Sequence, residues 1–99
     1  MKEKIIEECK KYGYLLDYEE EENGFLQFKN AEVREELQIF NVMIREELEY
    51  ISMAIIIDLG SWNEATDADM NNMEEVSEQI KLWLSPENLA EVEKYFLED

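Results

Sequence analysis

Carboxylates are the side chains of this sequence whose number and spacing suggest chemistry. Ten acidic residues lie between Glu46 and Ile80 with no Lys or Arg among them, and five more lie between Tyr12 and Phe28, also without a base. Helical carboxylates three or four residues apart lie about 5–6 Å from each other, comparable to the phosphates of a nucleic-acid strand, which step about 3.4 Å along the axis. The sequence therefore predicts a surface that fits a groove built for phosphates. A plain solvated face is the alternative.

One stretch of acids matches a metal-binding pattern. Its residues have the spacing of the oxygen ligands at the first, third, fifth and twelfth places of an EF-hand calcium loop. These residues are Asp67, Asp69, Asn71 and Glu78. However, Asn72 stands where the loop needs Gly, Glu74 stands where an apolar residue is usual, and a helical apolar pattern begins at Met73. We therefore interpret Asp69 as a helix N-cap and keep a calcium-binding module as an alternative function.

Other catalytic groups are scarce. The chain has no His, which removes the commonest general base and the usual zinc ligand. Its one cysteine, Cys9, lies on the apolar side of a helical pattern beside Glu8, so we interpret it as a small buried apolar residue. Because no pair of carboxylates stands apart from the rest, the sequence predicts no enzyme, no cofactor and no bound metal.

Composition limits the class of protein. The 99 residues carry 26 acids and 9 bases, a formal charge of −17, and 45% are hydrophobic. This balance predicts a single folded acidic domain over residues 1–99. Direct binding to nucleic acid or to an anionic membrane needs Lys and Arg, so neither is expected. A lone cysteine and an apolar run of only Met53 to Ile57 predict a cytoplasmic protein that does not span a membrane.

Two elements are expected before residue 30. Apolar residues at helical spacing predict a helix from Lys2 to Tyr12 that stops at Gly13. Residues 14–29 predict a hairpin with a three-residue loop of residues 22–24, in which Gly24 is left-handed. This register pairs Tyr18 with Phe28 and places Leu16, Tyr18, Leu26 and Phe28 on one face. It leaves the other face to the acids Asp17, Glu19 and Glu21.

A long central helix is expected next. Asn30 is a plausible N-cap, and the apolar residues beyond it recur at steps of three and four. They are Val33, Leu37, Phe40, Ile44, Leu48, Ile51 and Ile55. Further apolar residues at Ile39, Val42, Met43 and Met53 widen this stripe. The sequence does not decide between helix and strand for residues 50–59, because Ile55, Ile56 and Ile57 are β-branched and favour a strand.

Two helices are expected at the end of the chain. Asp69 would cap the first, in which Met73, Val76, Ile80 and Trp83 keep helical spacing. The sequence Ser85-Pro86-Glu87 predicts the start of the second, which would bury Leu89, Val92 and Phe96. The expected fold class is α+β, a helix-dominated single domain with one β-hairpin and a long central helix.

Function is predicted from the acids and one aromatic residue outside any stripe. The candidate partner-binding residues are Asp17, Glu19, Glu20, Glu21, Glu22, Glu46, Glu47, Glu49, Trp62, Asp67, Asp69, Glu74, Glu75 and Glu78. In size, charge and lack of catalytic residues, the chain resembles the small acidic inhibitors of phages and mobile elements, anti-CRISPR proteins among them. The resemblance implies an RNA-guided nuclease as partner, inhibited by occupation of its guide or DNA surface. An immunity protein or antitoxin that neutralises a basic nuclease toxin is the runner-up.

Overall fold

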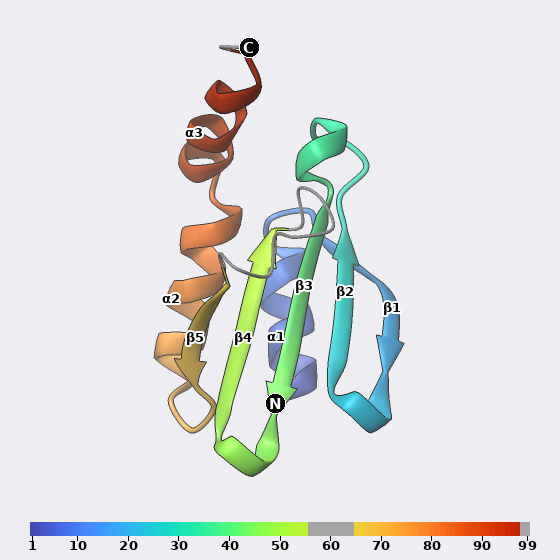
Figure 1. The fold of residues 1–99 in the computed structure, drawn as a ribbon, viewed down its shortest axis with the longest axis vertical. Helices are drawn as coiled ribbons and strands as arrows, with labels where there is room; N and C mark the ends of the chain where they lie inside the picture. Colours follow the sequence, from blue (N-terminus) through green and yellow to red (C-terminus); the bar gives the residue numbers. More distant parts are fainter. Residues whose placement is uncertain (56–64, 98–99) are drawn as a thin grey trace.

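The fold is a five-stranded antiparallel sheet with helices packed on one of its faces (Figure 1). The computed structural model describes residues 1–55 and 65–97, and the side chains among them up to residue 94. The strands lie side by side in chain order: β1 (Leu15–Glu20), β2 (Phe25–Lys29), β3 (Ile39–Arg45), β4 (Tyr50–Ile55) and β5 (Thr66–Asp69). The helices are α1 (Lys2–Lys10), α2 (Met73–Leu84) and α3 (Pro86–Leu97). Short 3-10 turns, η1 (Glu21–Asn23), η2 (Glu35–Leu37) and η3 (Glu46–Leu48), precede the three strands β2, β3 and β4.

The core lies between the sheet and the helices α1 and α2. Cross-strand rows of apolar residues form its sheet side, because alternate residues of a strand point to one face. One row pairs Leu26 with Val42 and Val42 with Met53, all buried. Ile5 of α1 and Ile80 of α2 are also completely buried in this cluster. The opposite face of the sheet, which Figure 1 shows from the front, carries no helix in the described part of the chain.

The long central helix is not present, and the expected helix-dominated fold class was wrong. The stripe from Phe40 onward forms the hairpin of β3 and β4, in which Ile44 pairs with Ile51, while Leu37 and Leu48 lie in the 3-10 turns η2 and η3. A step of four residues fits two strand periods as well as one helical turn, so spacing alone favoured the wrong element. Asn30 does not cap a helix, since its Oδ1 accepts a turn hydrogen bond from the Glu32 amide at 2.9 Å. Of the open segment 50–59, Tyr50–Ile55 is strand, and the remainder lies outside the described residues.

The register of the first hairpin also differs from the expectation. Tyr18 lies opposite Gln27, not Phe28, because an irregularity between Leu16 and Tyr18 inserts one extra residue into β1. This bulge turns Tyr18 to the open face, where 46% of its surface is exposed. The loop spans residues 21–24, and only Gly24, with φ of 66°, is left-handed as expected.

The helices agree with the sequence more closely. The first ends before Gly13, which has φ of 85°. The amide of Asn88 donates to Ser85 Oγ at 3.3 Å, which confirms the restart before Pro86. However, Asn72 rather than Asp69 is the N-cap of α2, accepting from the Glu75 amide at 3.2 Å. Within the described ranges, no helix is long and apolar enough to cross a membrane.

Candidate protein-binding site

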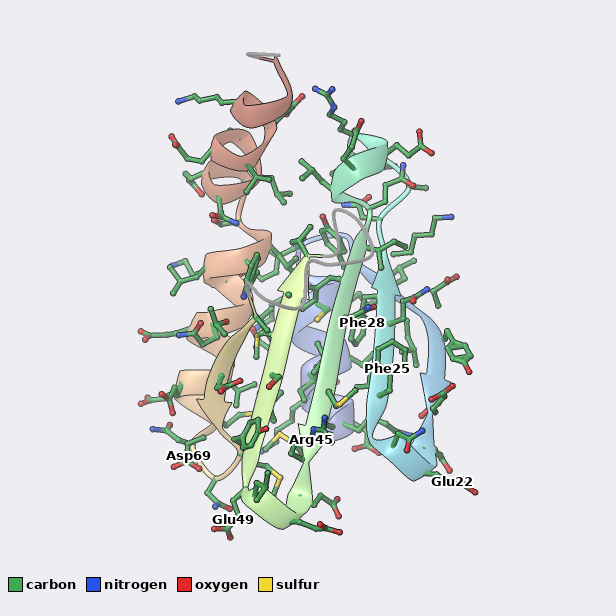
Figure 2. The ribbon with its side chains drawn as sticks, viewed as in Figure 1. Glu22, Phe25, Phe28, Arg45, Glu49 and Asp69 are labelled. Atoms are coloured by element: carbon green, nitrogen blue, oxygen red, sulfur yellow. The ribbon has the colours of Figure 1, made fainter. Side chains whose placement is uncertain are left out.

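The topology brings three acidic connections to one end of the sheet. In an antiparallel meander every second connection lies at the same end, so the β1–β2, β3–β4 and β5–α2 connections converge (Figure 1). Figure 2 shows Glu22 and Glu49 of the two hairpin connections at this end, together with Asp69, the last residue of β5. We call this region the acidic end and define it by the carboxylates of Glu20, Glu21, Glu22, Glu46, Glu47, Glu49, Asp69, Glu74 and Glu75.

Backbone hydrogen bonds join the three connections to one another. The Ile44 amide donates to the carbonyl oxygen of Gly24 at 2.8 Å, and the Met70 amide donates to that of Glu49 at 3.1 Å. A Cβ on Gly24 would also collide with the backbone carbonyl oxygen of Ile44, so the β1–β2 tip rests directly on β3. The carboxylates are therefore carried on a frame that is fixed relative to the sheet.

A groove of about 680 Å³ lies between the β1–β2 tip, the β3–β4 tip and the start of α1. Of the residues that the structure describes, seven carboxylates and two basic side chains, Lys2 and Arg45, line it. Six apolar residues also line it: Met1, Phe25, Leu26, Ile44, Leu48 and Met70. Leu48 and Met1 are 67% and 40% exposed. The groove therefore combines an apolar surface with a negative rim.

Three carboxylates at or beside the β1–β2 tip are engaged by neighbours. Lys2 Nζ lies 3.0 Å from Glu19 Oε2 and 3.4 Å from Glu21 Oε1, and the hydrogen bond to Glu19 raises the pKa of the Lys2 ammonium. The hydroxyl of Tyr18 donates to Glu20 Oε1 at 2.6 Å and, with the amide of Asn23, lowers the pKa of the Glu20 carboxyl. Glu20 thus remains ionised and fixed in orientation at neutral pH.

The acids near β5 have structural roles. The Asp69 amide donates to Glu75 Oε2 at 2.9 Å, while Asp69 Oδ1 accepts from the Asn71 amide at 2.9 Å. Ser52 Oγ donates to Asp67 Oδ1 at 2.6 Å. These bonds close the turn into α2 and hold two adjacent strands, so the acids at this corner are less available to a partner than those of the two hairpin tips.

Five predicted residues are not part of the acidic end. Asp17 lies in the bulge of edge strand β1, Asp67 lies inside β5, and Glu78 lies on the second turn of α2. Glu19 lies in β1 opposite Leu26, not on the face expected for the hairpin acids, and pairs with Lys2. Trp62 lies outside the described residues. The calcium-loop pattern is therefore divided among a strand, a turn and a helix, and no three acidic or cysteine side chains of the described part of the chain could together hold a metal ion. Cys9 is buried as predicted, and burial raises the pKa of its thiol.

Sequence reasoning missed the apolar part of the site. The apolar spacing predicts Leu48 in the core stripe of the central helix, whereas the structure exposes it at the β3–β4 tip. The available signal was its position inside the run Glu46-Glu47-Leu48-Glu49. An apolar residue surrounded by acids on both sides is typical of a turn more than of a buried helix face.

Comparison with models of known protein families, with curated proteins and with solved structures gives no significant match to this chain.

Proposed function

We propose that this protein is a stoichiometric inhibitor that acts in the cytoplasm by binding the basic nucleic-acid-binding surface of a larger protein, such as an RNA-guided nuclease, and excluding guide RNA or DNA. One observation carries the proposal: three separate connections deliver carboxylates to a single end of the sheet, where backbone hydrogen bonds hold them together. A fixed array of negative charge suits a surface that otherwise binds phosphates.

The availability of the tip carboxylates supports this proposal. Glu22, Glu46 and Glu47 are exposed and make no ion pair or side-chain hydrogen bond with any other described residue. Their charges are thus free to pair with Lys or Arg of a partner at little cost in broken interactions. Because opposite charges across an interface raise the association rate at low salt, binding is expected to weaken as salt increases.

Competition for labelled nucleic acid tests the proposal. The protein is titrated into purified basic nucleic-acid-binding proteins, RNA-guided nucleases and nuclease toxins among them, while the anisotropy of bound guide RNA or DNA is followed. We expect release at a one-to-one ratio from a responsive partner. A variant carrying Glu22→Lys, Glu46→Lys and Glu47→Lys should lose about tenfold or more in potency.

A matched variant distinguishes the effect of the acidic end from the effect of net charge. Glu32→Lys, Glu35→Lys and Glu87→Lys make the same change in net charge on exposed residues away from the acidic end. The proposal predicts that this control keeps its potency. Equal losses in both variants, or binding without release of nucleic acid, would contradict it. Release from a toxin alone would favour the immunity-protein alternative.

A further inference from the structure

We infer that the groove at the acidic end is the docking site for a cationic amphipathic helix of the partner, in which apolar side chains lie between Lys or Arg residues. The inference rests on the proposed function and specifies the segment that the acidic end recognises. It follows from the apolar lining of the groove, the charge of its rim and the pairing of the strands beneath it.

The apolar lining offers a place for an apolar side chain. Leu48 lies at the β3–β4 tip with 67% of its surface exposed, and Met1, which also lines the groove, is 40% exposed. Phe25, Ile44 and Met70 of the lining are only half-buried. A partner side chain that covers these atoms removes apolar surface from water, which is the main favourable term in association. A purely polar cation would leave this surface exposed.

The carboxylates of the rim determine the sign of the charge that a bound segment carries. Of the two basic side chains that line the groove, Lys2 is already paired with Glu19 and Glu21. Glu22, Glu46 and Glu47 lie on the rim without an ion pair among the described residues. A segment that enters the groove therefore meets excess negative charge from both tips. Charge complementarity requires Lys or Arg on both sides of its apolar residues.

The pairing of the floor strands favours a helix over an added strand. The residues of β2 and β3 that line the groove belong to strands with a neighbour on each side, since β2 lies between β1 and β3 and β3 between β2 and β4. The other lining strand, β1, lies at the edge of the sheet, but it contributes only Glu19 and Glu20, next to the bulge between Leu16 and Tyr18 that interrupts its regular pairing. Among the described residues, the floor therefore offers no regular free strand edge to an extended peptide. A bound segment must satisfy its own backbone hydrogen bonds, as a helix does.

Model peptides test the inference without the natural partner. The probe is a fluorescein-labelled peptide of roughly 14 Leu and Lys residues with helical spacing of the leucines. Two comparison peptides are a Leu-Lys peptide of the same composition with strict alternation, and an oligolysine of the same charge. Anisotropy at moderate salt should show the helical peptide binding most tightly.

Substitution of two exposed leucines, one inside the groove and one outside it, distinguishes binding in the groove from general electrostatic attraction. Leu48→Ser should weaken binding of the helical peptide by about fivefold, because a half-covered leucine is removed, and leave binding of oligolysine unchanged. Leu82 is 62% exposed on α2 outside the groove, so Leu82→Ser should change neither. Circular dichroism confirms that both variants fold. Equal effects of the two substitutions, or none from Leu48→Ser, would overturn the inference.

Methionine methyl groups report the location independently. In protein labelled with ¹³C at the Met methyls, the helical peptide should shift Met1 and Met70, which line the groove, and leave the buried Met53 unchanged. Shifts of Met1 and Met70 with protein concentration alone would identify a second copy as the occupant and overturn the inference.

The two proposals fail in different ways. If the helical peptide and oligolysine bind alike while nucleic-acid release persists, the groove inference fails and the proposed function stands. If the peptide binds in the groove but no basic protein releases its nucleic acid, the proposed function fails.

Discussion

The hydroxyl of Tyr14 donates a hydrogen bond of 2.6 Å to the backbone carbonyl oxygen of Leu37, and both residues are buried. This bond connects the segment between α1 and β1 with η2, which precedes β3. The Tyr14 ring also meets Phe40 edge to face, with ring centroids 6.4 Å apart. One side chain thus ties the first helix, the loop before β3 and the core together.

Replacing this tyrosine tests its contribution to stability. Tyr14→Phe keeps the ring and leaves the Leu37 carbonyl oxygen buried without its donor, so the free energy of unfolding should fall by about 1–3 kcal/mol. The substitution should also remove the part of the loss of stability at alkaline pH that comes from Tyr14. Burial raises the pKa of Tyr14 to about 12, so its contribution to stability is complete below an ordinary tyrosine pKa of about 10 and is lost as the pH rises toward 12.

Urea unfolding of both proteins between neutral pH and the alkaline limit measures the two effects. The wild type should lose stability above pH ~10, and Tyr14→Phe should lose less. Tyr18→Phe is the control, since Tyr18 is exposed and, within the described part of the chain, its hydroxyl bonds only to Glu20. A loss from Tyr18→Phe as large as that from Tyr14→Phe would argue against the role of the buried bond.

Salt should stabilise this protein. A formal charge of −17 on 99 residues repels itself in the compact state, and the Debye length falls from about 10 Å at 0.1 M to about 3 Å at 1 M salt. We therefore expect the melting temperature to rise with NaCl. The variant with Glu22→Lys, Glu46→Lys and Glu47→Lys should have a higher melting temperature at low salt, and this temperature should rise less with NaCl. A melting temperature that falls with NaCl would show that ion pairs outweigh repulsion.

The sequence predicted the helices because each carries its own local signals, such as Gly13 after the first and Ser85-Pro86 before the last. It failed in the middle, where Phe40, Ile44, Ile51 and Ile55 satisfy both periods. The informative residues are Val42 and Met53, which widen the apolar stripe if the segment is a helix. In the structure they are the alternate buried positions of two strands.

The candidate site was predicted in composition and not in arrangement. Acidic runs at Glu19–Glu22 and Glu46–Glu49 are visible in the sequence, but their approach depends on the pairing of β2 with β3. A helix in place of β3 and β4 would have separated the two runs. The apolar groove between them follows from the same pairing, so it was not predictable from local patterns.

Asn41 is a buried polar residue whose replacement should stabilise the fold. It is 7% exposed, and among the described residues its Oδ1 has no hydrogen-bond partner. Asn41→Val removes this unsatisfied oxygen and places a β-branched residue in β3, so we expect the free energy of unfolding to rise by about 1–2 kcal/mol. Gln38→Leu is the contrasting change, because Gln38 Nε2 donates to the Val33 carbonyl oxygen at 3.0 Å. Gln38→Leu should lower the free energy of unfolding. If urea unfolding shows that both substitutions change this free energy in the same direction, the interpretation is wrong.

Glu49 holds a backbone conformation that suits glycine better than glutamate. Its φ of 57° lies in the left-handed region, and among the described residues it is the only non-glycine with positive φ. This conformation costs an L-residue roughly 1–2 kcal/mol, and strained residues are often retained at functional sites.

Glu49→Gly relieves the strain and removes one charge from the acidic end, so thermal unfolding should show stability equal to or up to about 1 kcal/mol above the wild type. Glu47→Gly removes the same charge from η3, where glycine gains nothing, and should lower stability by about 0.5–1 kcal/mol. The proposed function adds that both variants should inhibit less strongly; a destabilised Glu49→Gly would show instead that its side chain supports the turn.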